Sequence, residues 1–197
     1  MKTVILKTGI CALFATCTLI PPAEAAQNTA IGGIRNTDFE SVQLNWKKPP
    51  KSKHPWTFRD AKRPYYWYYN ENTPAEGEVR NDAPAKGKNY FRLHPEKGFV
   101  LLGQFFSKSL PKGVEKMNIS LQVKGKGKVQ LYISGKNAAK KKTRLVFQVN
   151  SPEKWFLLQG IIEVPENPNS FWIRYDGTTP LDIDDFQLKA ISATAKK

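Results

Sequence analysis

The sequence predicts an all-β fold, an antiparallel β-sandwich of the jelly-roll type with roughly ten strands in two sheets. Apolar and polar residues alternate with a period of two through most of the chain, and no long stretch has the period of an amphipathic helix. Gly, Pro and Asn interrupt the alternating runs at short intervals. Many short alternating runs between turn residues are typical of sandwiches and jelly rolls, and no internal repeat points to a solenoid.

The clearest alternation lies in the middle of the chain. In MNISLQV (117–123) every second residue is apolar, and VQLYIS (129–134) repeats the pattern. The KGKGK segment between them (124–128) is interpreted as a tight hairpin turn. Further strands are expected at 90–93, 99–106, 144–149, 155–164, 171–176 and 181–188.

The N-terminus has the pattern of a secretory signal peptide. Two lysines precede an apolar stretch (8–20), and Ala23-Glu24-Ala25 forms an A-x-A cleavage site. We therefore expect export to the periplasm or the medium, with cleavage near Ala25. Both cysteines lie in the segment that would be removed, so no disulfide is expected in the mature chain. The expected organisation is a signal peptide (1–25), a loose leader (26–34), one β-sandwich domain (35–189) and a tail (190–197).

The chain is strongly basic, with a formal net charge of +14 at pH 7. Its lysines and arginines cluster at 47–53, 124–128 and 136–144. Such clusters are either solvated loops on a basic surface or a surface that attracts a polyanion. The polyanion could be an acidic polysaccharide, a cell-surface polymer or a nucleic acid, and composition does not choose among them.

The familiar catalytic motifs are absent from the sequence. It contains no G-x-S-x-G elbow, no H-E-x-x-H motif, and no cysteine outside the predicted signal peptide. We interpret His54 and His94 as surface histidines. A glycosidase needs two carboxylates that face each other across a groove, and nothing in the sequence places two acidic residues in that way. We therefore expect a protein that is not an enzyme.

Several segments, taken in order, resemble CenC-type carbohydrate-binding modules, the related jelly-roll families four, nine and twenty-two. The resemblance covers about residues 35–189 and implies a galactose-binding-like jelly roll. One departure is PAKG (84–87), where the family often has His-Ser-Gly. The segments are NTDFES (36–41), Trp46, PYYWYYN (64–70), NDAPAKGKNYFRL (81–93), Gln104, LPKGVEKMNISLQVKGKGKVQLYIS (110–134) and LDIDDFQL (181–188).

The resemblance also implies a structural calcium ion. In the family an opening Glu, an acidic residue before the mid-chain Gly loop and a closing Asp supply oxygen ligands. The matching positions are Glu40, Asp82 and Asp184, with Asp185 as the alternative to Asp184. Calcium takes six to eight oxygen ligands, so carboxylates at the two chain ends would suit it. The alternative is that these carboxylates pair with the abundant Lys and Arg side chains.

The stretch RPYYWYYN (63–70) contains five consecutive aromatic rings. A strand points successive side chains to opposite faces, so one set of rings is expected in the core and the other on the surface. Sugars stack on exposed rings and bond to polar groups beside them. The alternative is cross-strand packing of these rings on a half-buried sheet face. The candidate ligand-binding residues are Trp67, Tyr66, Tyr68, Arg92, Gln104, Gln122, Tyr132, Trp172 and Arg174.

Together these patterns favour a secreted, non-catalytic module that binds a polysaccharide or cell-surface glycan, acidic glycans included. Two alternatives stay open. One is a structural or interaction sandwich of the cell envelope. The other is a basic protein that binds polyanions, nucleic acid among them, without a sugar site. No segment beyond the signal peptide is expected to span a membrane.

Overall fold

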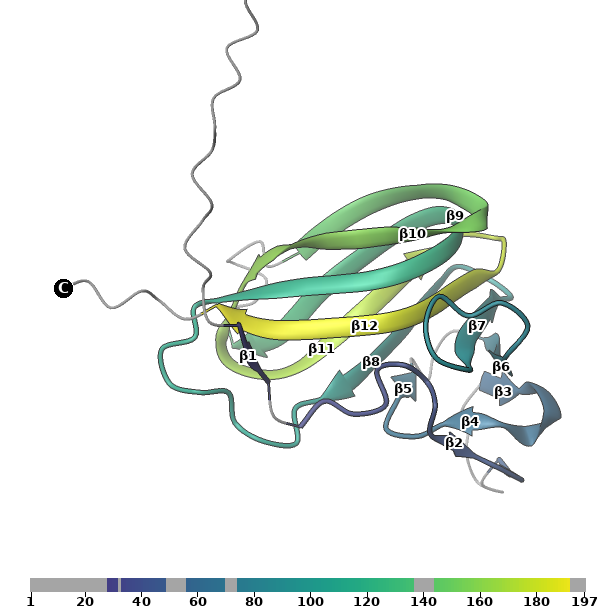
Figure 1. Ribbon diagram of the computed structural model, residues 1–197, viewed down its shortest axis with the longest axis horizontal. Coiled ribbons are helices and arrows are strands. Elements are labelled where there is room, and N and C mark those ends of the chain that lie inside the picture. The colour runs from purple at the N-terminus through teal and green to yellow at the C-terminus, as the bar shows by residue number, and fades with distance from the viewer. Residues whose placement is uncertain (1–27, 32, 49–55, 70–73, 137–143, 192–197) are drawn as a thin grey trace, which may run out of the picture.

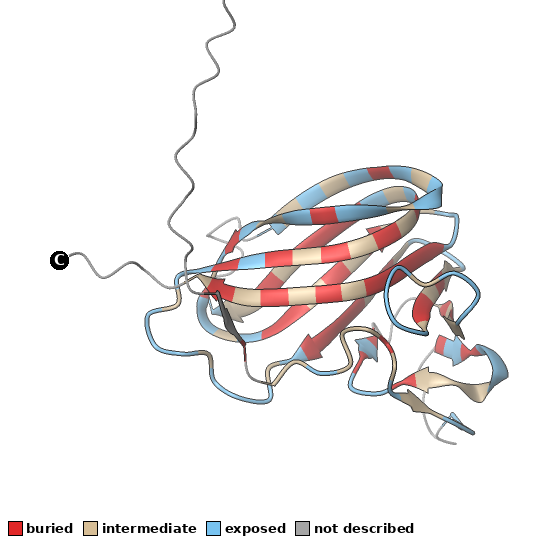
Figure 2. Ribbon diagram, viewed as in Figure 1, coloured by how far each residue is buried: buried red, intermediate tan, exposed pale blue. Residues whose placement is uncertain are grey.

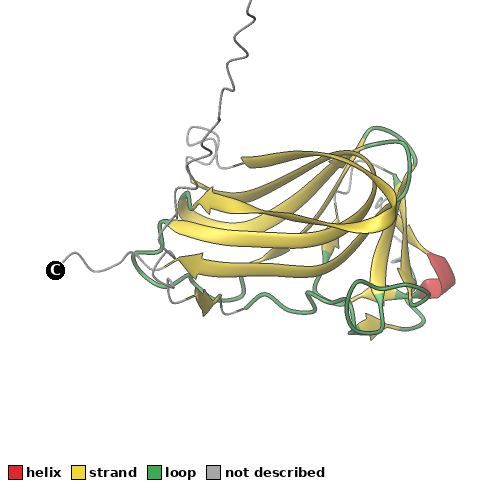
Figure 3. Cartoon of the chain, turned by 45° about the horizontal axis from the view of Figure 1, so that its top comes forward, coloured by secondary structure: helices red, strands yellow, loops and turns green. Residues whose placement is uncertain are grey.

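The computed structural model describes residues 28–31, 33–48, 56–69, 74–136 and 144–191. The regular secondary structure of the described chain is strand apart from one short 3-10 turn, η1 (Arg59–Ala61), as Figure 3 shows. None of the described residues form a helix long and apolar enough to span a membrane. The predicted all-β fold class is confirmed. The strands are β1 (Asn28–Ala30), β2 (Val42–Gln43), β3 (Trp56–Phe58), β4 (Arg63–Pro64), β5 (Tyr68–Tyr69), β6 (Ala75–Arg80), β7 (Tyr90–Pro95), β8 (Phe99–Phe105), β9 (Lys116–Lys136), β10 (Arg144–Glu163), β11 (Glu166–Asp176) and β12 (Leu181–Ile191).

Some sequence predictions fall on other parts of the chain. The predicted signal peptide (1–25), His54, and most of the basic segments 47–53 and 136–144 lie outside the described residues. The predicted leader is loose only in part, because β1 pairs with the end of β12, Asn28 opposite Ile191.

The strands form two layers that are continuous with each other through β9. The first half of β9 pairs with β12, and its second half pairs with β11. One layer therefore runs β3-β6-β7-β12-β9, and the other runs β9-β11-β8-β5, while β10 follows β9 along both. The four long strands β9 to β12 extend along the molecule, and the short strands β2 to β7 gather at one end (Figure 1). Among these pairings only β3 with β6 is parallel.

The core lies between the two layers. Phe171 of β11 and Phe186 of β12 belong to strands that are not paired, yet their rings stack with centroids 4.3 Å apart. Likewise, Tyr69 of β5 contacts Phe91 of β7 at 6.3 Å between centroids. Buried positions alternate with partly exposed ones along much of β9 and β11 (Figure 2). The inner faces of the layers thus share one apolar core, as in other sandwiches.

The KGKGK segment is not the hairpin turn that the sequence predicted. It lies inside β9, where the strand bends from one layer into the other, and it keeps its pairing with β10. Gly125 and Gly127 point inward at the bend. A Cβ atom on Gly127 would lie 2.5 Å from Tyr175 Cε2, so the tyrosine ring occupies the space that a side chain would need. Glycine is required here for close packing inside a curved strand.

The RPYYWYYN stretch follows the predicted alternation only in part. Trp67 and Tyr69 are buried, whereas Tyr66 and Tyr68 are exposed. Tyr65, which strict alternation would place on the same face as Trp67 and Tyr69, is also exposed. The reason is a turn between β4 and β5, where Tyr66 takes a left-handed backbone conformation with a φ of 69°. A residue in that conformation breaks the strand, so the alternation starts again after it.

Candidate functional site

The outer surface of the second layer carries a row of aromatic side chains across neighbouring strands. In β11 the residues Phe171, Ile173 and Tyr175 point into the core, so Trp172 points outward. Trp172 lies opposite Gly103 of β8 on one side and Tyr132 of β9 on the other. The aromatic row, as we call it, consists of Tyr68, Phe105, Trp172 and Tyr132.

The Trp172 ring packs against the backbone at Gly103. A Cβ atom there would lie 2.6 Å from Trp172 Cε3, so the indole lies close over the β8 backbone. The ring nitrogen Nε1 donates a hydrogen bond of 3.0 Å to Ser170 Oγ, which fixes the orientation of the ring. The missing side chain at Gly103 thus lets a large ring lie against the sheet.

The neighbouring rings form a connected strip with Trp172. Phe105 meets Trp172 edge-on with centroids 5.9 Å apart, and it meets Tyr68 edge-on at 5.1 Å. Tyr68 is 47% exposed and Phe105 is 50% exposed. Large rings that are half exposed and packed against each other form a rigid apolar surface in contact with water.

Charged groups lie beside the strip in fixed positions. Arg174 donates two hydrogen bonds to the Asp176 carboxylate, of 3.0 and 2.9 Å, and its guanidinium lies 3.7 Å above the ring centroid of Phe99. Gln130 donates a third bond to Asp176, of 3.1 Å. The Arg174 hydrogen bonds hold the pKa of the Asp176 carboxyl below its usual range, so the group is ionised at neutral pH.

Tyr66 lies at the turn before Tyr68 and is 46% exposed. The Arg35 guanidinium lies 5.1 Å from its ring centroid, and Arg35 Nη1 lies 3.5 Å from its hydroxyl oxygen. Tyr66 therefore faces solvent, with a cation on its ring.

Trp67 and Gln104 were predicted as ligand residues, but the structure places both in the interior. Trp67 is 0% exposed, stacks on Phe39 at 4.9 Å between centroids, and donates from Nε1 to the Asn36 carbonyl oxygen. Gln104 is buried, and its side-chain amide bonds to both the backbone N–H and the carbonyl of Arg35. We correct both assignments, because neither side chain reaches a surface that a glycan could touch.

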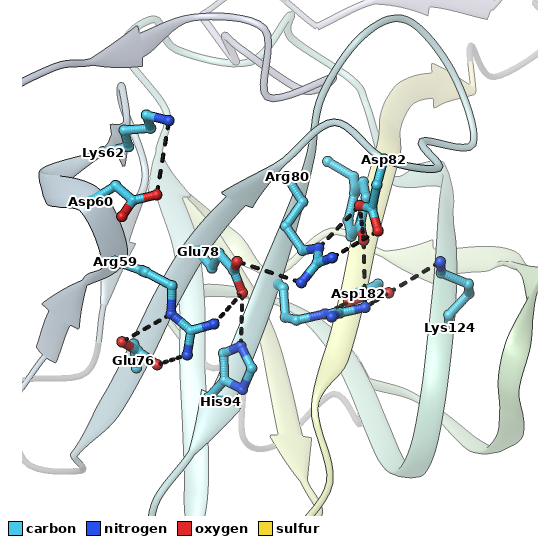
Figure 4. A network of polar contacts seen from close by, with 12 residues as sticks. Arg59, Asp60, Lys62, Glu76, Glu78, Arg80, Asp82, His94, Lys124 and Asp182 are labelled. Atoms are coloured by element: carbon cyan, nitrogen blue, oxygen red, sulfur yellow. Dashed lines mark hydrogen bonds and ion pairs between the residues drawn. The ribbon is translucent and has the colours of Figure 1, made fainter.

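Arg92 and Gln122 lie on the outer surface of the first layer, away from the aromatic row. Arg92 is bound to Asp182 through two hydrogen bonds, of 2.5 and 2.8 Å, and Lys124 approaches the same carboxylate at 3.3 Å (Figure 4). Gln122 lies opposite Asp184 in the pairing of β9 with β12. The structure thus divides the predicted ligand residues between two surfaces. Within the described residues, three connected rings lie on the second layer, and on the first layer Tyr90 meets Trp155 edge-on at 5.4 Å.

The four predicted calcium ligands form two pairs with different hydrogen-bond partners. Glu40 accepts hydrogen bonds from the backbone N–H groups of Lys88 and Asn89, and Asp184 accepts one of 2.8 Å from the backbone of Lys86. Glu40 and Asp184 therefore hold the same loop. Asp184 is fully buried, and burial raises the pKa of its carboxyl.

Asp82 and Asp185 have other partners. Asp82 forms an ion pair of 2.7 Å with Arg80 and accepts a bond from the Tyr90 hydroxyl (Figure 4). The Arg80 contact lowers the pKa of Asp82, and burial is the main cause that raises the pKa of Tyr90 to about 12. Asp185 pairs with the Lys86 ammonium at 3.1 Å. Among the described residues no three His, Cys, Asp or Glu side chains form a group suited to a metal ion. Asp82 is thus engaged by Arg80 and Tyr90, whereas Glu40 and Asp184 bond to the 86–89 loop.

The rings of the aromatic row are in contact with solvent, Tyr68 and Phe105 more so than Trp172 and Tyr132. Two hollows of about 470 Å³ each lie elsewhere, one beside Val114 and Glu166 and the other beside Lys86 and Gln187. Neither is lined by a residue of the aromatic row.

Sequence reasoning missed four residues of this surface. Phe105 and Asp176 could have been found, because strict alternation in FVLLGQFF and FWIRYD places both on the outer face. The same alternation would have placed Gln104 inside. Arg35 and Arg144 could not have been found, since the tyrosines that they contact lie far away in the sequence or across a strand pairing.

Comparisons with known proteins bear on the fold. No protein-family model matches the sequence, and no curated protein matches it. Among solved structures, TmCBM61 in complex with β-1,4-galactotriose has a TM-score of 0.50 and 14% identity, covering 80% of this chain and 97% of that one. The enzymatically active domain of tailspike protein 4 from bacteriophage CBA120 has a TM-score of 0.50 and 10% identity, covering 64% of this chain and 20% of that one.

The CBM22-1 xylan-binding domain of Xyn10C from Paenibacillus barcinonensis has a TM-score of 0.45 and 17% identity, covering 65% of this chain and 87% of that one. The expected likeness to the jelly-roll fold of carbohydrate-binding modules is thus confirmed, and TmCBM61 carries that conclusion. A CenC-type assignment stays a prediction.

Proposed function

We propose that this chain is a non-catalytic module that binds a glycan chain across the aromatic row. The observation that carries the proposal is the strip formed by Tyr68, Phe105 and Trp172, in which Tyr68 and Phe105 are about half exposed and Trp172 is partly exposed, beside polar groups held by hydrogen bonds. Pyranose rings have apolar C–H faces that stack on aromatic rings, while their hydroxyls bond to charged and amide groups. The Arg174–Asp176 pair is placed to supply such bonds.

The dimensions of the row favour a polymer over a single sugar. The paired residues Tyr68, Gly103, Trp172, Tyr132 and Arg144 run across five strands. Four steps between strands at about 4.8 Å each give a path of about 19 Å. A path of this length accommodates several linked sugar units, and an open surface lets a chain enter and leave at both ends.

The similarity in fold to TmCBM61 supports glycan binding in general, without identifying the glycan. TmCBM61, which has the same fold, was crystallised with a galactose trisaccharide. Since one fold hosts many functions, the fold alone does not assign the ligand, and the proposal rests on the aromatic row. We further propose that the module acts outside the cytoplasm, on the basis of the signal-peptide pattern at 1–25.

A panel of soluble neutral and acidic polysaccharides tests the proposal by isothermal titration at several salt concentrations. We expect saturable binding of at least one glycan, with an affinity that keeps a salt-independent part, because ring stacking does not depend on counterions. An affinity that falls steeply as the salt concentration rises, together with comparable binding of nucleic acid, would favour the polyanion alternative. No binding to any glycan or polyanion would favour an interaction sandwich of the envelope.

A structural calcium ion is a separate proposal. Glu40 and Asp184 fit it best, because both carboxylates lie against the 86–89 loop and could add oxygen ligands to backbone carbonyls there. An ion bound at 100 times its dissociation constant stabilises the fold by about 2.7 kcal/mol. A chelator is therefore expected to lower the melting temperature of the wild type.

Two variants, one at a proposed ligand and one at a control position, make the calcium test specific. Asp184→Asn should remove the response to chelator, whereas Asp82→Asn should retain it, because Asp82 is bound to Arg80 and Tyr90. Equal melting temperatures in chelator and in millimolar calcium, with no metal detected in the purified protein, would contradict the proposal.

A further inference from the structure

Two arginines flank the aromatic row without a carboxylate partner. Arg35 stacks on Tyr66, in the turn that leads into Tyr68 at one end of the row, and Arg144 stacks on Tyr132 at the other end, 5.3 Å from the ring centroid. Both arginines are exposed. In the part of the chain that the structure describes, neither one lies within salt-bridge distance of an acidic side chain.

Among the described residues, Arg63 also stacks on a tyrosine, Tyr69, and it donates to the Trp67 carbonyl, whereas four other arginines form ion pairs. Arg59, Arg80, Arg92 and Arg174 each form an ion pair with a carboxylate of this chain. Their hydrogen-bonding capacity is therefore largely used. Stacking on a tyrosine ring leaves the edge of a guanidinium open, so Arg35 and Arg144 keep donors available for an external acceptor.

The charge around the row supports an anionic ligand. In the stretches 99–105, 128–134, 144–148 and 170–176, which form this surface, Asp176 is the sole acidic residue. Its charge is already matched by Arg174, and Lys128 lies opposite it in the strand pairing. The surface thus has a positive excess, which attracts anions and repels cations.

We propose that the aromatic row binds a polysaccharide that contains uronic acid units, with Arg35 and Arg144 each binding a sugar carboxylate near opposite ends of the row. This inference rests on the proposed glycan binding and narrows its ligand class. A guanidinium presents two parallel N–H donors that match the two oxygens of a carboxylate. The path from Tyr68 to Arg144 is about 19 Å long, so the two carboxylates must belong to different units of one chain.

The test uses a pair of polymers that differ only in charge. Polygalacturonate carries free carboxylates, and its fully methyl-esterified form carries none on the same backbone. We expect the full-length protein at about 0.1 M salt to bind polygalacturonate more tightly than the ester. The variant Arg35→Gln/Arg144→Gln should lose about ten-fold in affinity for polygalacturonate, since it removes two exposed ion pairs and each such pair contributes about three-fold. It should bind the ester as the wild type does.

A matched control removes the same charge elsewhere. Lys112→Gln/Lys154→Gln changes two exposed residues outside the row and should leave both affinities within about two-fold. Dextran sulfate, which carries sulfate groups in place of carboxylates, tests whether the site prefers sulfate. Unchanged binding of polygalacturonate by the arginine variant, equal binding of the two polymers by the wild type, or tighter binding of dextran sulfate would each overturn the uronate inference.

The outcomes also separate this inference from the proposed function. If Trp172→Ala weakens binding of both polymers while the arginine variant changes neither, the glycan site stands and the uronate inference fails. If the arginine variant loses polygalacturonate but Trp172→Ala binds it normally, the arginines bind an anion and the aromatic row is not the sugar site.

Discussion

Replacing Trp67 by alanine is expected to lower the free energy of unfolding by about 3–5 kcal/mol, because the change leaves a large cavity in the core. The ring is 0% exposed, stacks on Phe39, and meets Phe171 and Phe186 edge-on. Its removal also takes from the Asn36 carbonyl one of two hydrogen-bond donors, the other being the Phe39 backbone N–H. Urea unfolding followed by circular dichroism measures the effect.

Tyr68→Ala is the matched control for Trp67→Ala. It removes a ring one residue away that points to the surface, so we expect a change in unfolding free energy of about 1 kcal/mol or less. Similar losses in the two variants would mean that this segment is not divided into a buried and an exposed set, and the placement of the aromatic row would be wrong.

The second large effect is expected for Trp172→Ala, in binding. Central aromatic residues of an interface typically contribute about 1–3 kcal/mol, so the affinity for a bound glycan should fall about five- to 150-fold. Stability should change by about 1 kcal/mol or less, because the ring lies over the outer face of β8 and contributes little to the core. Calorimetry of glycan binding and thermal unfolding of the same samples give both quantities.

Trp155→Ala is the control for Trp172→Ala. Trp155 lies at the outer face of the first layer, where it contacts Tyr90 and Lys124. We expect this variant to bind glycan as the wild type does. A loss of binding in Trp155→Ala with none in Trp172→Ala would move the site to the first layer, beside Arg92 and Gln122.

The sequence predicted the strands well where alternation is undisturbed. The runs that became β8, β11 and β12 were found, because the pleat forces every second side chain to one face. The prediction failed at 124–128, where glycines were interpreted as a turn. There the glycines sit inside a strand because Tyr175 fills the inner side of the bend, a packing relation between residues about fifty positions apart.

The site was harder to predict than the fold. Alternation correctly placed Trp172, Tyr132 and Arg174 on the outer face of their strands. It does not show which strands lie in the same layer and so share one outer surface. That depends on strand order, and β9 lies between β12 and β11, so its two halves face different sides of the molecule. Arg92 and Tyr132 were therefore grouped together, although they lie on opposite layers.

The indole N–H signals of the five tryptophans provide the most direct measurement of the central claim. They are recorded by nuclear magnetic resonance of the nitrogen-15-labelled protein during titration with a bound glycan, and Trp172→Phe identifies the Trp172 signal. The account predicts that the Trp172 signal shifts or broadens most, while those of the buried Trp56 and Trp67 stay in place. A dominant shift of the Trp155 signal, or saturation of the protein with no change at Trp172, would contradict glycan binding at the aromatic row.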